Sequence, residues 1–288
     1  MPPRRIGFAT AAHCPRLTAD DQRAAAVLEA RGLEVCPVVW SGEDEPAVDS
    51  LVIRSTWDYH QRPDEFRRWL DRVEAKQLPV WNPASVLRWN LDKRYLRELE
   101  QAGVRTVPTV WLDRESPPLR ELLESHGWDD VVAKPAISAS GWRTFRSSRD
   151  RAADDEPAFR KLVTDCPAML QPFIPQVADE GEWSLMFFGG KFSHAVLKHP
   201  APGGFLVQTE HGGRVEAAIP TSTMVQEAEE AVARAPGAVI YGRVDGVREG
   251  CRLRLMELEL LEPVLFFEYC PLSPHRFADA LMDALTLR

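Results

Sequence analysis

This chain of 288 residues has few lysines, no excess of positive charge and no long apolar run. Lysine and arginine total 35 against 43 aspartates and glutamates, giving a net charge of -8 and a pI near 5.5. Nucleic-acid and membrane-surface proteins favour a basic stripe, so we expect neither kind of partner. The short apolar patch near the N-terminus soon meets polar residues and fits a first β-strand better than a signal peptide.

Cysteine and histidine motifs are also missing. The five cysteines lie far apart without a CxxC pair, and the seven histidines form no HExxH motif. These patterns argue against a disulfide framework and a zinc site, and they favour a cytoplasmic protein with reduced thiols. They leave the oligomeric state open, and a homodimer is compatible with them.

The first part of the chain alternates strands and helices. Strands are predicted at 4–10, 33–40, 50–59 and 78–83, and helices at 18–32 and 62–76. This rhythm predicts an α/β, doubly wound parallel sheet with ligands at the carboxyl ends of its strands. No GxGxxG follows the first strand, so the dinucleotide fingerprint is missing.

Beyond residue 85 the regular alternation of strands and helices ends. One amphipathic helix is predicted over 85–104, followed by mixed strands and helices up to about residue 174. Two hairpins come next, with turns at Gly189-Gly190 and near residue 250, and a last helix over 273–288 capped by Ser273. We therefore expect three units: 1–85 as a substrate-binding α/β domain, 86–168 as a central subdomain, and 169–288 as a C-terminal subdomain with a metal site.

The segment RLRLMELELLEP, residues 252–263, reads as a strand with carboxylates on one face. Alternation places Glu257 and Glu259 on the same side, and the hairpin places Asp245 across from Glu257. Three neighbouring acids repel one another unless a cation lies among them, and such oxygen ligands suit Mg²⁺ or Mn²⁺. The alternative is a solvated strand face whose acids are neutralised by arginines of the same strand, Arg252 and Arg254.

Only six lysines occur, so a lysine in an apolar or glycine-rich context indicates that a compact charge is needed there. Lys134 follows three apolar residues in VVAKPAISASGW, where a lysine is costly unless it reaches an anion. The Ser/Ala/Gly loop behind it can bring backbone amides close to a phosphate. Lys93 lies in the predicted helix 85–104. The alternatives are an edge-strand lysine and a solvated helix face.

Two further segments suggest ligand contacts. AMLQPFIP ends an apolar strand in Gln171, Phe173 and Ile174, which suits an adenine ring or, alternatively, a core strand entering a linker. RSTWDYH lies at the carboxyl end of a predicted strand and is either a substrate pocket or a surface turn with a packed tryptophan. In the pocket interpretation an arginine grips a carboxylate, an aspartate binds an ammonium and aromatic rings form the wall; the residues are Arg54, Ser55, Trp57, Asp58 and Tyr59.

The ordered set of these motifs resembles the ATP-grasp ligases. The set runs through both lysines, QPFI, GEWSLMFFGGKFSHAVLK, GGFLVQTEHGG and MELELLEP, and it covers roughly residues 86 to 270. It is similar to the branch that holds glutathione synthetase and the RimK-type ligases. RSTWDY, NPASVLRWNLDK and MELELLEP also resemble a smaller branch that includes the cyclo-ligase of D-cycloserine biosynthesis.

The resemblance implies two α+β subdomains that clasp ATP, preceded by the N-terminal domain. Lys93 and Lys134 would hold the α- and β-phosphates, and the loop with Ser138, Ser140 and Gly141 would close over them. Adenine would lie against Gln171, Phe173 and Ile174, with Glu182 near the ribose or substrate. Lys198 and Arg243 would face the transferred phosphoryl group. The three acids, Asp245, Glu257 and Glu259, would bind two Mg²⁺ ions, with Mn²⁺ as a substitute.

At three positions the chain departs from the family pattern, and each departure makes the predicted site more negative. Glu259 stands where an asparagine is usual, and Leu206 and Ser184 stand where arginines are expected. Arg243 or Arg214 would supply the missing positive charge. The function implied is an ATP-dependent carboxylate–amine ligase that acts through an acyl-phosphate on an amino-acid-like or peptide substrate, as in antibiotic biosynthesis. An intramolecular cyclo-ligase and a non-catalytic ATP-binding module are the alternatives.

Overall fold

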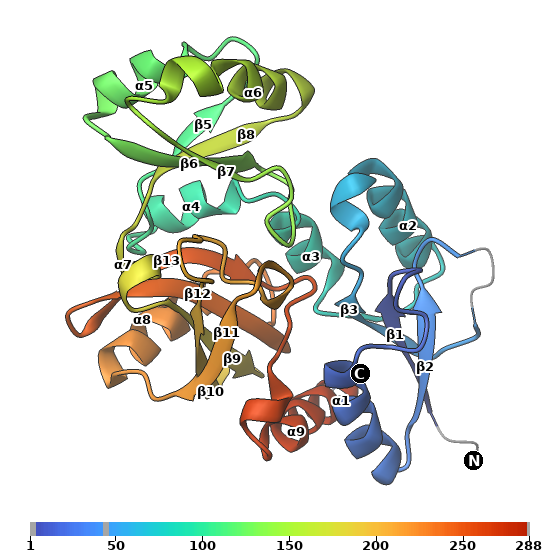
Figure 1. Ribbon diagram of the computed structural model, residues 1–288. Coiled ribbons are helices and arrows are strands. Elements are labelled where there is room, and N and C mark those ends of the chain that lie inside the picture. The colour runs from blue at the N-terminus through green and yellow to red at the C-terminus, as the bar shows by residue number, and fades with distance from the viewer. Residues whose placement is uncertain (1–3, 43–45, 287–288) are drawn as a thin grey trace.

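The structure is a computed structural model that describes residues 4–42 and 46–286, and its strands form three sheets (Figure 1). The first sheet has the order β2-β1-β3-β4, and all its strands are parallel, as predicted. Its strands are β1 (Arg5–Thr10), β2 (Glu34–Val39), β3 (Ser50–Ser55) and β4 (Val80–Trp81).

The two helices of this N-terminal unit, α1 (Ala19–Ala30) and α2 (Pro63–Ala75), cover opposite faces of the sheet. Phe8 of β1 packs in the same apolar cluster as Leu28 of α1, whereas Ala9 packs with residues of α2. Successive residues of a strand point to opposite faces, so the two clusters lie on the two sides of the sheet. The doubly wound arrangement is thereby confirmed.

The single helix predicted over 85–104 is wrong: two helices, α3 (Ala84–Asn90) and α4 (Tyr95–Gln101), replace it. Asn90 at the end of α3 bonds to the backbone of the strand around Leu258 and Leu260, at 2.7 and 2.6 Å. The amide of Lys93 then donates to the carbonyl of Ala136 (2.8 Å). These long-range bonds replace helical ones, so the chain turns and Lys93 lies in the turn.

The middle unit is an antiparallel sheet in the order β5-β8-β6-β7. Helices α5 (Leu119–His126) and α6 (Ala152–Asp165) pack together on one face, above the sheet in Figure 1. The strands are β5 (Val110–Leu112), β6 (Asp130–Pro135), β7 (Phe145–Ser148) and β8 (Ala168–Pro172). This sheet therefore extends past the predicted boundary at residue 168, and the division into three units stays a prediction.

The C-terminal sheet has the order β11-β10-β9-β12-β13 and is antiparallel. Both predicted hairpins are confirmed, one turning at Gly189-Gly190 between β9 and β10 and one at Gly250 between β12 and β13. Its strands are β9 (Glu182–Phe188), β10 (Lys191–His199), β11 (Arg214–Ala218), β12 (Tyr241–Glu249) and β13 (Arg252–Glu259). Helix α8 (Ser222–Val232) packs on one face of this sheet.

The last helix, α9 (Ser273–Thr286), packs against the first helix, α1, so the C-terminal segment lies beside the N-terminal unit (Figure 1). The predicted cap is corrected: Ser273 is the first helical residue, and its hydroxyl donates to the carbonyl of Cys270 (2.6 Å). Residues 287–288 of the predicted helix lie outside the described part. Short pieces complete the chain: α7 (Gln176–Asp179) and the 3-10 turns η1 (Tyr59–Gln61), η2 (Thr209–His211) and η3 (Phe267–Tyr269).

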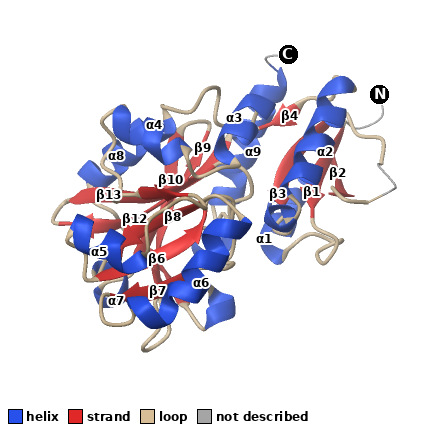
Figure 2. Cartoon of the chain, turned by 90° about the horizontal axis from the view of Figure 1, so that it is seen from above, coloured by secondary structure: helices blue, strands red, loops and turns tan. Residues whose placement is uncertain are grey.

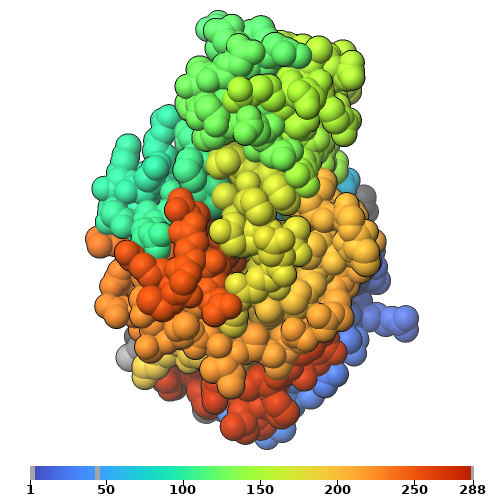
Figure 3. Space-filling model, turned by 60° about the vertical axis from the view of Figure 1, so that its left-hand side comes forward, coloured from blue at the N-terminus to red at the C-terminus, as the bar shows by residue number. Residues whose placement is uncertain are grey.

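All three units contribute residues to one cavity. Seen from above, the middle sheet overlaps the C-terminal sheet, and the N-terminal unit lies beside both (Figure 2). The yellow segment after β8 runs from the middle unit down to the C-terminal sheet on the face shown in Figure 3. Asn82 ties the N-terminal unit to the C-terminal sheet, because its side chain bonds to the backbone of Ile240, Tyr241 and Leu260. Among the described helices, none has the length and apolar character that a membrane span requires.

Candidate active site

A cavity of about 430 Å³ lies where the three units meet. Every residue that the resemblance implicates in nucleotide binding, catalysis or metal binding lines it. Those residues are Lys93, Lys134, Ser138, Ser140, Gly141, Gln171, Phe173, Ile174, Glu182, Lys198, Arg243, Asp245, Glu257 and Glu259. They come from the α3–α4 turn, β6 and its following loop, β8, β9, β10, β12 and β13, so the fold gathers segments more than 160 residues apart.

Two lysines, Lys93 and Lys134, line the cavity. The Nζ of Lys93 lies 2.6 Å from the carbonyl of Ser138 and 3.0 Å from Glu257. Burial opposes its charge, yet the pKa of Lys93 is raised because Glu257 stabilises the ammonium. The side chain of Lys134 is half-buried and forms no hydrogen bond or ion pair with another described residue, and burial lowers its pKa. A cation that lines the cavity without an ion-pair partner among the described residues indicates that an anionic ligand binds here.

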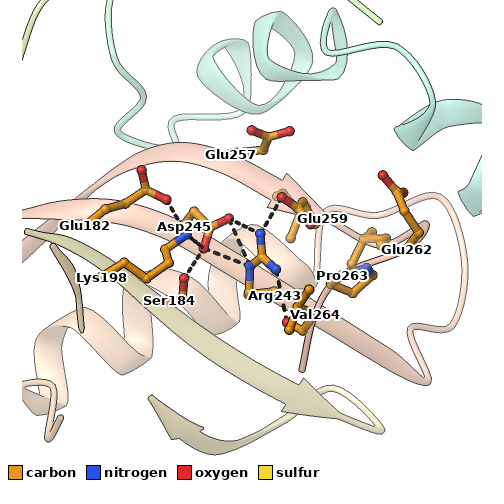
Figure 4. A network of polar contacts seen from close by, with 12 residues as sticks. Glu182, Ser184, Lys198, Arg243, Asp245, Glu257, Glu259, Glu262, Pro263 and Val264 are labelled. Atoms are coloured by element: carbon orange, nitrogen blue, oxygen red, sulfur yellow. Dashed lines mark hydrogen bonds and ion pairs between the residues drawn. The ribbon is translucent and has the colours of Figure 1, made fainter. Parts of the chain in front are cut away.

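The floor of the cavity is a row of alternating charges on β9, β10, β12 and β13 (Figure 4). Arg243 binds Asp245 at 2.9 Å and Glu259 at 2.5 Å. Lys198 lies 3.3 Å from Asp245, which also accepts a hydrogen bond from the hydroxyl of Ser184. The residue that replaces an expected arginine, Ser184, therefore orients the central carboxylate.

The carboxylates of this row are stabilised to different extents. Although burial alone would raise it, the pKa of Asp245 lies far below its usual range because Arg243 and Lys198 stabilise the carboxylate. Burial raises the pKa of Glu259 to about 8; Arg243 opposes the shift, and Asp245 and Glu257 add to it. Burial thus disfavours the charged form of Glu259, and an added cation would stabilise it.

The predicted register of the acidic hairpin is confirmed, because Asp245 pairs with Glu257 and Arg243 pairs with Glu259. A ready-made cation site is nevertheless absent from the described residues, which contain no cluster of three acidic, histidine or cysteine side chains arranged to hold an ion. Asp245 turns its oxygens to Arg243 instead.

The donor chemistry of the carboxylates still fits a divalent ion, since hard oxygen ligands suit Mg²⁺ and a cation would offset the burial that disfavours the charged form of Glu259. The alternative partners proposed from the sequence do not neutralise the acids. Arg252 pairs with Glu227, and Arg254 pairs with Glu249. The positive charge beside Glu259 comes from Arg243 of the neighbouring strand, which the sequence alone does not indicate.

A β-bulge in β13 brings a residue to the cavity that the sequence places elsewhere. Between Asp245 and Gly246 the pairing skips Met256, so Met256 and Glu257 both line the cavity. Strict alternation would have put Met256 on the buried face with Leu258. No signal in the sequence marks such a bulge.

The apolar end of the cavity lies beside β8. The Nε2 of Gln171 donates to the hydroxyl of Thr109 (3.0 Å), and the guanidinium of Arg146 lies 3.7 Å from the ring centre of Phe173. The amide of Phe173 donates to the carbonyl of Asp130 (2.9 Å), so this backbone donor is already engaged. Ile174 completes the wall.

The small-residue loop after β6 covers the cavity. Ser140 and Gly141 both have positive φ angles, of 51° and 69°. Leu206, which stands where an arginine is expected, packs here: a Cβ atom on Gly141 would lie 3.2 Å from Leu206 Cδ1. His211 also lies 3.3 Å from the carbonyl of Ser140. At the position of the expected arginine, Leu206 thus makes an apolar contact with the loop.

Of the substrate residues expected in the N-terminal domain, the structure brings only Trp57 to the cavity. Its Nε1 donates to the carbonyl of Glu262 (3.1 Å). The guanidinium of Arg54 lies in the interior, 2.8 Å from Asp21 and 3.1 Å from the carbonyl of Pro263.

The other four expected substrate residues have partners elsewhere. Ser55 bonds to the hydroxyl of Thr10, and Asp58 accepts from Trp40 Nε1 (2.6 Å) and Arg62 (2.9 Å). Tyr59 is buried in an apolar cluster, and Arg214 is exposed beside Glu216. These side chains are used in holding the fold, and none of them lines the cavity.

Comparisons with known proteins agree with this architecture. Residues 6–82 match the family described as the N-terminal domain of D-cycloserine synthetase DcsG. The cycloserine biosynthesis protein DcsG of Streptomyces lavendulae is 32% identical over 278 residues, covering 88% of each chain. The crystal structure of D-cycloserine synthetase DcsG superposes with a TM-score of 0.88 at 26% identity, covering 98% of this chain and 99% of that one.

A RimK-domain ATP-grasp protein from Sphaerobacter thermophilus superposes with a TM-score of 0.69, covering 96% of this chain and 99% of that one. Its identity to this chain is 15%, so it bears on the fold alone. The ATP-grasp fold expected from the motifs is confirmed, and so is the similarity to the branch with the cycloserine cyclo-ligase.

Proposed function

Because the chain belongs to the family of the cycloserine biosynthesis protein DcsG, among the ATP-grasp ligases, we propose that it activates a carboxylate of an amino-acid-like molecule with ATP and joins it to a nitrogen. The observation that carries the proposal is a pair of lysines, Lys93 buried and Lys134 half-buried, that line one cavity together with a row of acids. Lys134 has no anionic partner of its own among the described residues, and a triphosphate would supply one.

The reaction takes two displacements. A substrate carboxylate oxygen attacks the γ-phosphorus, the bond to the β-phosphate oxygen breaks, and ADP leaves. The nitrogen lone pair then attacks the acyl carbon, the bond to the phosphoryl oxygen breaks, and phosphate leaves while the nitrogen loses a proton. In this assignment Lys93 and Lys134 hold phosphate oxygens, and Lys198 and Arg243 face the transferred group.

ATP-grasp ligases use ATP with a divalent cation. In this chain Glu257 and Glu259, with Asp245, would hold two Mg²⁺ ions, for which Mn²⁺ would substitute. The cations would neutralise the phosphate oxygens on which charge develops. Asp245 can join the set only when Arg243 releases it, and a triphosphate offers Arg243 a new anion. Nucleotide and metal would therefore bind together.

Ring closure within one molecule is the second form of the same chemistry. Similarity over most of the chain to a protein named for cycloserine biosynthesis favours it, since cycloserine is a cyclic compound. A non-catalytic ATP-binding module is disfavoured, because binding alone scarcely requires an acidic set opposite the lysines. The two ligase forms differ in the number of substrates consumed.

The test is a screen for nucleotide turnover. The protein is incubated with ATP, Mg²⁺ and a panel of amino acids that includes hydroxamates and ureido-substituted acids, and ADP, AMP and phosphate are quantified. ADP and phosphate released in step with one panel member support the proposal, and AMP release contradicts it. The product mass then separates ring closure from joining of two molecules, because ring closure needs no second substrate.

A further inference from the structure

Glu262 lines the cavity but belongs to none of its ion pairs. Its side chain is 8% exposed, and no other described residue forms a hydrogen bond or ion pair with its carboxylate. In Figure 4 Glu182 and Glu262 lie at opposite ends of the charged row, with Arg243 between them. A carboxylate buried without a partner is costly, so its presence needs an explanation.

The nearest cation does not satisfy this carboxylate. Lys93 affects the charge of Glu262 through space, but its ammonium donates to the carbonyl of Ser138 and pairs with Glu257. Burial raises the pKa of Glu262 to about 7, and Glu257 adds to the shift. A donor supplied by a ligand would remove this penalty.

The backbone around Glu262 is held by three side chains. Trp57 donates to the carbonyl of Glu262 (3.1 Å), Arg54 to that of Pro263 (3.1 Å) and Arg243 to that of Val264 (3.0 Å). Two of these donors come from the N-terminal unit. These bonds fix the backbone that carries Glu262, which limits where its carboxylate can lie and so preorganises it for binding.

Glu262 lies apart from the proposed adenine contacts. The adenine wall lies at β8, whereas Lys93, which is assigned to the phosphates, acts on the charge of Glu262 through space. Glu262 follows β13 on the side of Trp57, where the cavity meets the N-terminal unit. In-line transfer places the acyl group on the side of the γ-phosphorus away from ADP, so the acceptor nitrogen binds away from the adenine wall.

We propose that the carboxylate of Glu262 binds the N–H group of the nitrogen that attacks the acyl-phosphate, with Trp57 holding Glu262 in place. Glu262 is then a specificity-determining residue for an amine-type or ureido-type acceptor. The assignment rests on the proposed ligase function. It separates Glu262 from Glu257 and Glu259, which serve the metal and phosphates in that proposal.

Hydroxylamine distinguishes the two roles, since it captures an acyl-phosphate as a hydroxamate without the natural acceptor. The experiment uses the panel compound that supports ADP release, and compares wild type, Glu262→Gln and Glu268→Gln. Glu268 is an exposed glutamate six residues further on. Two products are measured for each protein: the one formed with the natural nitrogen, and the hydroxamate at saturating hydroxylamine. A titration with Mg²⁺ and AMP-PNP checks that each variant is folded.

Loss of one charge-assisted hydrogen bond predicts that Glu262→Gln lowers kcat/KM for the natural product about 10- to 100-fold. Hydroxamate formation should stay within about threefold of wild type, because the phosphoryl step is intact. Glu268→Gln should match wild type in both. Equal loss of both products, or loss of neither, overturns the assignment. A wild-type protein that gives neither ADP nor hydroxamate overturns the ligase proposal itself, and the assignment with it.

Discussion

Arg54 and Asp21 form an ion pair in the interior of the protein, with Arg54 Nε 2.8 Å from Asp21 Oδ1 and each side chain 2% exposed. The guanidinium also donates to the carbonyl of Pro263, 209 residues away, and lies 5.3 Å from the ring centre of Tyr241. The pair therefore joins the N-terminal sheet to the loop after β13. Arg54 thus lies outside the cavity, although its place at the end of β3 predicts a substrate contact, and we expect its role to be structural.

Replacing Arg54 with alanine should lower the free energy of unfolding by about 3–5 kcal/mol, because Asp21 is left as an uncompensated buried charge. Denaturant unfolding measures the change. The double variant Arg54→Met with Asp21→Asn should regain most of it, since neither charge remains. Arg67→Ala, which breaks an exposed pair with Asp64, should change stability by less than about 1 kcal/mol.

If Arg54 instead held a substrate, Arg54→Ala would raise KM for that substrate and leave unfolding unchanged. That pattern would restore the pocket interpretation of RSTWDYH.

Gly141 in the loop over the cavity has a φ angle of 69°, and a Cβ atom there would lie 3.2 Å from Leu206 Cδ1. Gly141→Ala should lose about 1 kcal/mol of stability through the left-handed backbone, and the contact should also displace the loop. We expect KM for ATP to rise several-fold. Steady-state kinetics at saturating co-substrate measure it.

Gly190 provides the matched control, because its φ angle is 74° and no heavy atom lies within 4 Å of an added Cβ. Gly190→Ala should show a similar stability loss with an unchanged KM for ATP. Equal kinetics for the two variants would mean that the loop does not contact the nucleotide.

His194 should make the protein less stable in acid. The ring is buried on β10, its Nε2 lies 3.0 Å from the carbonyl of Leu265, and burial with nearby Arg276 lowers its pKa from 6.5 to about 4. Between these values the unfolded chain binds a proton that the folded protein does not. Stability is therefore unaffected above pH 6.5 and falls as the pH drops toward 4, by about 3 kcal/mol in all.

His194→Gln keeps a donor for the carbonyl of Leu265 and removes the titration. Its free energy of unfolding, measured in denaturant from pH 7.5 to 4, should fall less steeply than that of wild type. His275→Gln, a change at an exposed position on α9, should follow the wild-type slope. Parallel slopes for wild type and His194→Gln would contradict the prediction.

Features that depend on neighbouring residues could be predicted from the sequence. The alternation of strands and helices up to residue 83 predicted the parallel sheet, and Gly189-Gly190 predicted a hairpin turn. The turn at Gly250 then placed Asp245 opposite Glu257, because register follows from the position of the turn.

Features that depend on distant partners could not be predicted. The break at Lys93 arises from bonds to Ala136 and from Asn90 to β13, about 170 residues on. The bulge at Met256 leaves no mark in the pattern of polar and apolar residues. A periodic pattern contains no information about such contacts, and it likewise does not reveal that Asp21 is the partner of Arg54.

Glu257 allows a direct test of the metal assignment, because it pairs with Lys93 in the structure and would bind a metal ion in the proposed function. In the structure it binds Lys93 at 3.0 Å, and the proposed function gives it a metal ion as well. Glu257→Gln should lower kcat more than about 100-fold by removing charge that the transition state needs. It should also raise the Mg²⁺ concentration required for half-maximal ADP release. Glu229→Gln, an exposed change on α8, should alter neither.

The Mg²⁺ titration separates the two roles of Glu257. If the carboxylate only orients Lys93, the variant will bind ATP weakly while its Mg²⁺ dependence stays that of wild type. If it ligates the ion, excess Mg²⁺ will recover part of the lost rate, because mass action can offset a weakened site. Arg243 should matter in the same titration, since it competes with the metal for Asp245 and Glu259. An unchanged Mg²⁺ dependence in Glu257→Gln would therefore remove the acidic hairpin from the metal site and leave it as the partner of Lys93 and Arg243.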